Sequence, residues 1–156
     1  MTELEIANFF IKKGVDDKKQ VDHLKLQKLM YYAYGWNLAI TDGERLFNEK
    51  FAAWAYGPVI ESIFHWFKGW GRSPIDSLAG MAVGGVITYP QVEPTNTETY
   101  SLLQKIWQTH GKYSGIELSN ETHEPGSPWD IARHQKHLKY LDDADIKTYF
   151  KARLNK

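Results

Sequence analysis

The segment from Leu24 to Ile40 has apolar side chains that point in nearly every direction when it is wound as an α-helix. Such a helix is either buried on all sides or spans a membrane. Three tyrosines and four polar residues lie within the segment, and their polar groups need partners that lipid does not supply. The pattern therefore predicts a central buried helix over about 24–41. Its one narrow solvent-exposed edge should carry Lys25, Lys28 and Tyr32.

Further helices are predicted on both sides of this segment. Thr2 with Glu5 forms a capping-box pattern for a first helix that ends at Gly14. Gly57 followed by Pro58 predicts another helix start, because proline suits the first helical turn. The apolar residues of that helix share one arc: Val59, Ile60, Ile63, Phe64, Trp66, Phe67 and Trp70. Capping patterns place the other helix starts at Asp22, Thr95, Ser114, Ser127 and Asp142.

The helical pattern breaks from Gly71 to Asn96. Glycines, prolines and the alternating "AVGGVITYP" predict a loop with at most a small β-hairpin near 82–90, turning at Gly84–Gly85. A loop of this length is expected to be partly ordered or functional. The fold class is therefore mainly α: a compact multi-helix domain around the central helix, and one domain over 1–156.

The composition of the chain excludes several classes of function. The net charge is zero, and no cysteine is present for disulfide or thiolate chemistry. The first ten residues lack a signal-peptide pattern, and no apolar run is long enough for a bilayer. We therefore expect a soluble cytoplasmic protein with no membrane partner. Aromatic residues make up 14% of the chain, a density that is often found where binding surfaces add to a core.

Catalytic patterns are weak. His134 and His137, spaced i, i+3, could hold a metal together with His123, which leaves a metal-dependent enzyme as an alternative. His110 is expected to be a hydrogen-bonded core histidine. No phosphate-binding loop or nucleophile elbow is present, so no cofactor and no enzymatic activity are expected. The second alternative is a prophage DNA-binding regulator that uses the basic tail 133–156, although nucleic-acid binding has no clear footprint.

Three segments carry a family resemblance: "LKLQKLMYYAYGW" (24–36), "AWAYGPV" (53–59) and "LSNETHEPGSPW" (118–129). In this order and spacing they resemble the signature blocks of the Panacea antitoxin domain family, also called SocA-like or GepA-like, which is frequent in bacteria and prophages. We carry the signature positions over as a fold framework: Leu24, Gln27, Tyr31, Trp36, Trp54, Gly57, Pro58, Thr122, His123, Pro128 and Trp129. Among them Trp36, Trp54 and Trp129 are expected to be core residues.

The resemblance implies an antitoxin that neutralises a cognate protein toxin, encoded beside it, by direct binding. Whether neutralisation blocks the toxin or delivers it to a protease as an adaptor is left open, as is the oligomeric state. Specificity for a partner should lie on exposed, adaptable segments, and 71–96 is the best such segment. The partner-binding residues predicted here are Trp66 and Trp70 beside that loop, and Lys25, Lys28 and Tyr32 on the exposed edge.

Overall fold

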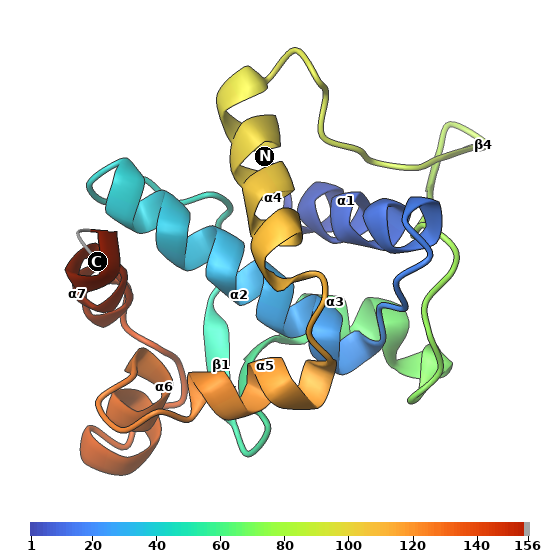
Figure 1. Cartoon of the computed structure of the whole chain (residues 1–156). Coiled ribbons are helices and arrows are strands. Elements are labelled where there is room, and N and C mark those ends of the chain that lie inside the picture. The colour runs from blue at the N-terminus through green and yellow to red at the C-terminus, as the bar shows by residue number, and fades with distance from the viewer. Residues whose placement is uncertain (155–156) are drawn as a thin grey trace.

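A computed structural model describes residues 1–154 and confirms the mainly α fold (Figure 1). Seven helices and two short hairpins follow one another along the chain. Their bounds are α1 Glu3–Asp16, α2 His23–Ile40, β1 Phe51–Trp54, β2 Gly57–Ile60, α3 Glu61–Phe67, the 3-10 turn η1 Lys68–Trp70, β3 Met81–Val83, β4 Val86–Thr88, α4 Thr97–His110, α5 Gly115–Thr122, α6 Pro128–Asp130, the π turn η2 Ile131–Gln135 and α7 Asp143–Leu154. In residues 1–154, no helix combines the length and apolarity needed to cross a bilayer.

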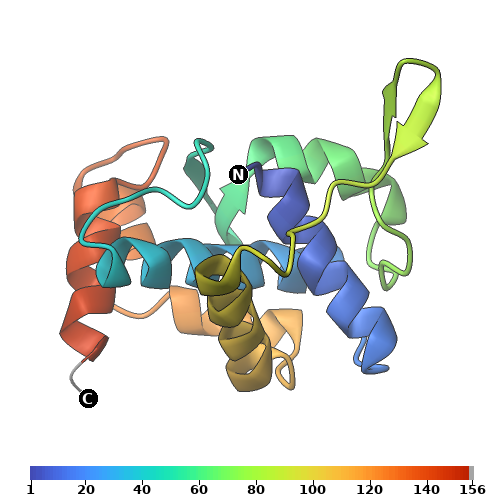
Figure 2. The same cartoon turned by 90° about the horizontal axis from the view of Figure 1, so that it is seen from above.

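Helix α2 runs through the middle of the molecule, as its all-round apolar pattern predicts (Figure 2). Helices α1, α4, α5 and α7 all pack against it, together with β2. The approach of α7 is close enough that a Cβ on Gly35 would lie 2.1 Å from the Phe150 ring. The Tyr34 hydroxyl reaches Asp143 at 2.8 Å, so this tyrosine is buried without an unsatisfied polar group.

Most predicted helix caps are present. Thr2 and Ser114 form capping boxes with Glu5 and Glu117, and the side chains of Asp22 and Ser127 accept the cap hydrogen bonds of α2 and α6. Two expectations are wrong. Helix α1 continues to Asp16, because Gly14 packs against Val21 from inside the helix instead of ending it. The other concerns α4, which begins at Thr97 after Asn96 with no side-chain cap, so the predicted Thr95 box does not form.

The predicted helix start at Gly57–Pro58 is also wrong. These residues open strand β2, which pairs antiparallel with β1 through Trp54 opposite Gly57, and α3 begins only at Glu61. Val59 and Ile60 are buried in this strand, and its partner β1 pairs along its other edge with the returning segment 139–141. The bonds are Ala53 N–H to the Lys139 carbonyl (2.9 Å) and Leu141 N–H to the Phe51 carbonyl (2.8 Å). This pairing is non-local, so helix-cap patterns do not reveal it.

The long loop from 71 to 96 is partly ordered, as expected, and contains the predicted hairpin. Ile75 and Val92 are buried, and the Ile75 N–H donates to the Val21 carbonyl at 2.8 Å. Strands β3 and β4 meet at a two-residue turn in which Gly84 and Gly85 both have positive φ, at 56° and 79°. A turn with two positive φ angles suits the twist of a tight hairpin and favours glycine at both positions.

Candidate functional site

The β3–β4 hairpin is the most exposed apolar element of the described chain. It projects from the rest of the molecule (Figure 2), and its large apolar side chains are 43% to 63% exposed. They are Met81, Val83, Val86, Ile87 and Tyr89. Segment 81–89 contains no charged residue. By the ladder register, Met81, Val83 and Val86 share one face of the hairpin and Ile87 lies on the other. An exposed apolar element of this kind is a candidate interaction site.

A buried asparagine fixes the base of this hairpin. Asn8, on α1, is fully buried and makes three hydrogen bonds to the two chain segments that lead into and out of the hairpin. Its Nδ2 donates to the carbonyls of Ala79 (3.0 Å) and Pro90 (2.8 Å), and its Oδ1 accepts from the Ala79 N–H (2.9 Å). The hairpin therefore leaves the core in a set direction. Asn8 was not among the residues predicted from the sequence, although a polar residue among the apolar positions of "EIANFF" is a detectable signal.

The two tryptophans predicted beside this loop differ. Trp66 is 43% exposed at the end of α3, so its ring is available to a partner. Trp70 is half-buried in η1 and packs against the hydrophobic core. The prediction of a partner contact stays untested for both, but only Trp66 presents an exposed indole.

The exposed edge predicted on α2 is wrong, because Lys25, Lys28 and Tyr32 are all buried. Helices α4 and α5 cover this side of α2. Lys25 Nζ donates to the Gly111 carbonyl at 2.5 Å, and the Tyr32 hydroxyl donates to Glu121 at 3.0 Å. These side chains therefore belong to the packed framework and form no exposed ridge. The prediction that they contact a partner stays untested. Their surface position was predicted because lysine side chains are almost always found at the surface, and Tyr32 lies beside both lysines on the helix.

Lys28 is the least expected buried group. It is completely buried, and its Nζ donates to the Pro58 carbonyl at 2.9 Å. Burial without a counter-charge disfavours the ammonium form and lowers the Lys28 pKa to about 7. Burial, and then the positive charge of Lys28, also lowers the pKa of nearby His123. The His123 ring stacks on Trp129 with centroids 4.1 Å apart, and within residues 1–154 its Nε2 has no hydrogen-bond partner.

The signature residues converge on the β1–β2 hairpin. Side chains from three separate segments donate to its carbonyls, and Gln27 pairs with both main-chain groups of Ile60. The other donors are Arg133 to Ala53 (2.7 Å), Trp129 Nε1 to Trp54 (2.7 Å), Ser119 to Tyr56 (2.6 Å) and Lys28 to Pro58 (2.9 Å). Residues of the first and third blocks, together with Arg133 just beyond the third, thus hold one turn, with Tyr56 exposed at its tip.

The remaining signature positions pack around the same turn or along α2. Gly57 has φ +109°, and a Cβ there would lie 2.7 Å from Thr122 Oγ1 and 2.8 Å from Lys28 Cε. Thr122 is buried below it, and Pro128 occupies the first turn of α6 as predicted. Trp129 is buried, as expected. Tyr31 is buried in α2, and Leu24, Trp36 and Trp54 are only partly buried.

The three histidines of the metal-enzyme alternative do not assemble. His137 has φ +54° and lies beyond the π turn that contains His134, so the two do not share a helix face. His134 Nδ1 instead lies 2.9 Å from Asp130 Oδ1. No cluster of three or more His, Cys, Asp or Glu residues that could hold a metal occurs in residues 1–154. His110 departs from expectation too, because it stacks on Tyr32 while its buried Nδ1 has no hydrogen-bond partner in that part of the chain.

The basic tail is engaged within the protein. Its side chains contact carboxylates and one carbonyl: Arg133 with Ala53, Lys136 with Asp145, Lys147 and Lys151 with Asp42, and Arg153 with Glu124. The DNA-binding alternative requires basic side chains in this tail that are free to contact phosphates. Most of the basic side chains described in the tail are instead paired within the protein. Lys156, the last basic residue of the predicted tail, lies outside the described residues.

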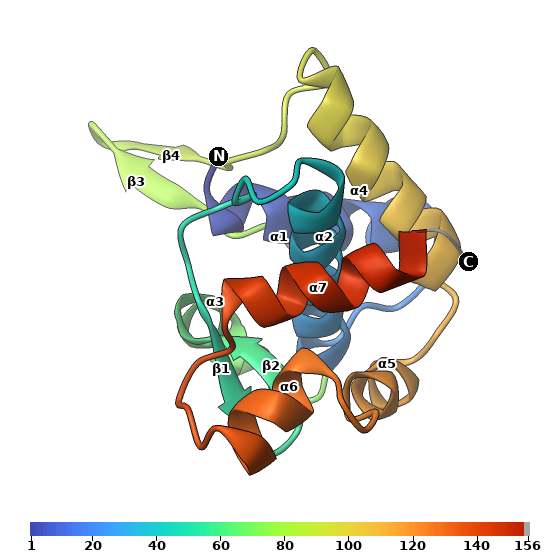
Figure 3. The same ribbon diagram turned by 90° about the vertical axis from the view of Figure 1, so that its left-hand side faces the viewer.

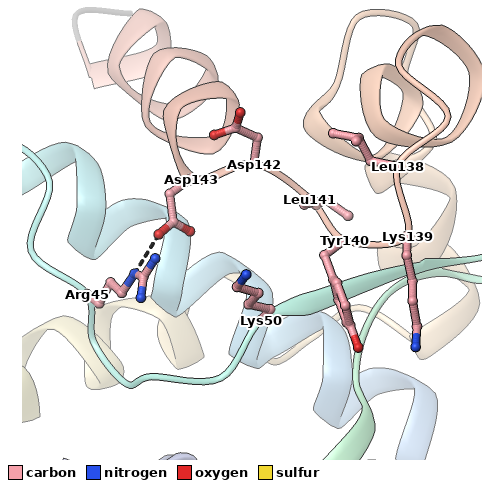
Figure 4. Close-up of a pocket in the computed structure, with 8 residues that line it drawn as sticks. All are labelled: Arg45, Lys50, Leu138, Lys139, Tyr140, Leu141, Asp142 and Asp143. Atoms are coloured by element: carbon pink, nitrogen blue, oxygen red, sulfur yellow. Dashed lines mark hydrogen bonds and ion pairs between the residues drawn. The ribbon is translucent and has the colours of Figure 1, made fainter.

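Two surface hollows occur among the described residues. One, of about 390 Å³, lies beside the loop that leads into β1 (Figure 4). Arg45 is paired there with Asp143 at 2.7 Å, and the amines of Lys50 and Lys139 both lie near the ring of Tyr140. The cations of this hollow are therefore already engaged. The other hollow, of about 420 Å³, is lined by residues of α2, α4, α5 and α7. Figure 3 shows α7 crossing in front of α2, with α4 and α5 on the same side of it.

Comparisons with known proteins point to one family. The family model described as "Antitoxin SocA-like, Panacea domain" matches residues 26–130. Antitoxin SocA of Caulobacter vibrioides (strain NA1000 / CB15N) is 29% identical over 133 residues, which cover 81% of this chain and 67% of that relative. No solved structure matches the chain. The matched range contains the second and third signature blocks, most of the first, and the β3–β4 hairpin.

Proposed function

The chain belongs to the SocA-like Panacea antitoxin domain family, and from this premise we propose that it neutralises a cognate protein toxin by direct binding. Membership supports an antitoxin role and a non-enzymatic one. The proposal adds the mode, a protein–protein complex, and the partner, the product of the adjacent gene. In this complex the chain acts as a binding protein and needs no cofactor.

The observation that carries the proposal is the apolar β3–β4 hairpin. Five large apolar side chains on an uncharged, projecting element are exposed. Burying them against a partner removes their apolar surface from water, which is the main favourable term in protein association. The Asn8 hydrogen bonds hold the hairpin in place before binding, and this reduces the ordering cost of complex formation.

Matched substitutions test this placement. Ile87 in β4 and Ile116 in α5 are both isoleucines with similar exposure, 63% and 68%. Ile87→Asp introduces a charge into the proposed interface, whereas Ile116→Asp introduces the same charge on a different element. The adjacent gene product is expressed with each variant, growth is scored, and thermal stability is measured on each purified protein.

We expect wild type and Ile116→Asp to restore growth, and Ile87→Asp to fail while keeping its melting temperature. An adjacent product that is harmless alone, or that stays lethal with wild type, contradicts the antitoxin function. Equal rescue by both variants contradicts the hairpin as the contact. Toxin that accumulates in a stable complex supports neutralisation by blocking. Toxin whose level falls only when a protease is present supports delivery for proteolysis instead.

A further inference from the structure

The β3–β4 hairpin has two open main-chain edges. Its strands pair as Met81–Thr88, Ala82–Ile87 and Val83–Val86, with Val83 and Val86 flanking the two-residue turn. The pair that flanks such a turn exchanges both of its hydrogen bonds, and the next pair directs its N–H and C=O groups outward. The main-chain groups of Ala82 and Ile87 therefore point away from the ladder, one on each edge.

The second hairpin of the same chain shows the contrasting arrangement. The outer edge of β1 pairs with the returning segment at Lys139 and Leu141, with an isolated bridge between Ala52 and Tyr140. On β2, the main-chain groups of Ile60 are satisfied by Gln27. Both edges of that hairpin are thus covered by the protein itself, and seven of its eight strand residues are buried.

The β3–β4 hairpin also lacks the features that protect free strand edges. Proteins usually guard such edges with charged side chains, prolines or a covering loop. Residues 81–88 contain neither a charge nor a proline, and every residue of β3 and β4 is exposed. The stem is closed below the ladder by Asn8, which bridges Ala79 and Pro90, so the open edges begin where the core ends.

We infer that the hairpin binds its protein partner by strand addition: an extended segment of the partner pairs with the edge at Ala82 or the edge at Ile87. This inference rests on the proposed antitoxin function and adds the chemistry of the bound segment. That segment is extended and uncharged, and its alternate apolar side chains cover the exposed side chains of the hairpin. The outward N–H and C=O groups give affinity, and the apolar contacts give selectivity.

The first experiment uses the full-length chain with the purified product of the adjacent gene. Amide hydrogen exchange is followed by NMR for the free chain and for the complex. Strand addition places one outward amide in a new hydrogen bond, so exchange at Ala82 or Ile87 should slow by about 100-fold or more. The amides of Val83 and Val86 already bond within the hairpin, so they serve as internal references.

The second experiment removes each outward donor. Ala82→Pro and Ile87→Pro each delete one outward N–H, a change that an edge position tolerates. Ala82→Ser and Ile87→Val retain the N–H as matched controls. One of the two proline variants should bind about tenfold or more weakly, corresponding to loss of main-chain pairing at that edge. Its control keeps the outward N–H and should therefore bind more tightly than the proline variant at the same edge by about the same factor. All four variants should keep the wild-type melting temperature.

The outcomes separate the two claims. If wild type forms no complex with the adjacent gene product, the proposed function fails and this inference fails with it. If the complex forms, but neither amide is protected and both proline variants bind normally, strand addition is wrong while the antitoxin function stands. Protection at one edge together with weakened binding of the proline variant at that same edge supports the inference.

Discussion

The buried amine of Lys28 makes a measurable prediction about stability and pH. Its pKa in the folded protein is about 7, against 10.5 for an exposed lysine. Between pH 7 and pH 10.5 the Lys28 amine is mostly protonated in the unfolded chain but at most half protonated in the folded chain. The free energy of unfolding must therefore rise as the pH increases from 7 toward 10.5. Above pH 10 the buried tyrosines act in the opposite direction, because burial raises the pKa of Tyr31, Tyr32 and Tyr34.

The size of the effect follows from the two pKa values. Linkage gives a destabilisation of about 4 kcal/mol from Lys28 at pH 7 and about 1.5 kcal/mol at pH 9.5. Wild type should therefore gain about 3 kcal/mol from this residue over that interval. Lys28→Met keeps the length of the side chain and removes the titrating group, so the variant should lack this gain.

The assay is urea unfolding of wild type and Lys28→Met at about pH 7 and pH 9.5. Lys105→Met, at an exposed position on α4, controls for loss of a lysine as such and should behave like wild type. Lys25, whose pKa is also lowered by burial, titrates in all three proteins and cancels in the comparison. If Lys28→Met gains as much stability with pH as wild type does, the buried amine is not the source, and the reasoning about Lys28 is refuted.

Three further predictions concern the framework and the proposed interface. Asn8→Ala should weaken toxin binding and increase proteolytic cleavage of the hairpin while circular dichroism shows unchanged helix content, because the hairpin loses its hydrogen-bonded base; unchanged binding would contradict this role. Gly57→Ala should destabilise by about 3 kcal/mol in urea unfolding, since φ is positive and a Cβ has no room, and a loss below about 1 kcal/mol would count against it. Trp70→Ala should lower the melting temperature, because this ring packs against the core. Trp66→Ala should leave the melting temperature nearly unchanged and weaken toxin binding measured by calorimetry. A larger loss of melting temperature for Trp66→Ala than for Trp70→Ala would contradict the burial assigned to the two rings.

The local elements that depend on neighbouring residues were predictable from the sequence. Capping boxes at Thr2 and Ser114, the cap at Asp22 and the Gly84–Gly85 turn all form as expected. Each involves hydrogen bonds or backbone angles within a few residues, so the local sequence contains the necessary information. The all-round apolar pattern of α2 likewise predicted its central position, because only full coverage by other elements satisfies such a surface.

The errors share a physical cause, which is that distant segments decided the outcome. Pro58 lies in a strand because segment 139–141 and Gln27 bond to that hairpin. Periodicity alone does not distinguish a short buried strand from a helix turn. The family resemblance marked the residues that hold this hairpin, although it did not say what they hold.

The sequence by itself determined the helical class, the central helix, the family resemblance and the place of a small hairpin within segment 71–96. Only the tertiary structure decided which polar side chains are buried. Lys28 is enclosed because α5 and the β1–β2 hairpin close over it, and Asn8 is enclosed because the hairpin stems pack on α1. Burial of a polar group depends on hydrogen-bond partners that are distant in sequence, and no local pattern encodes them.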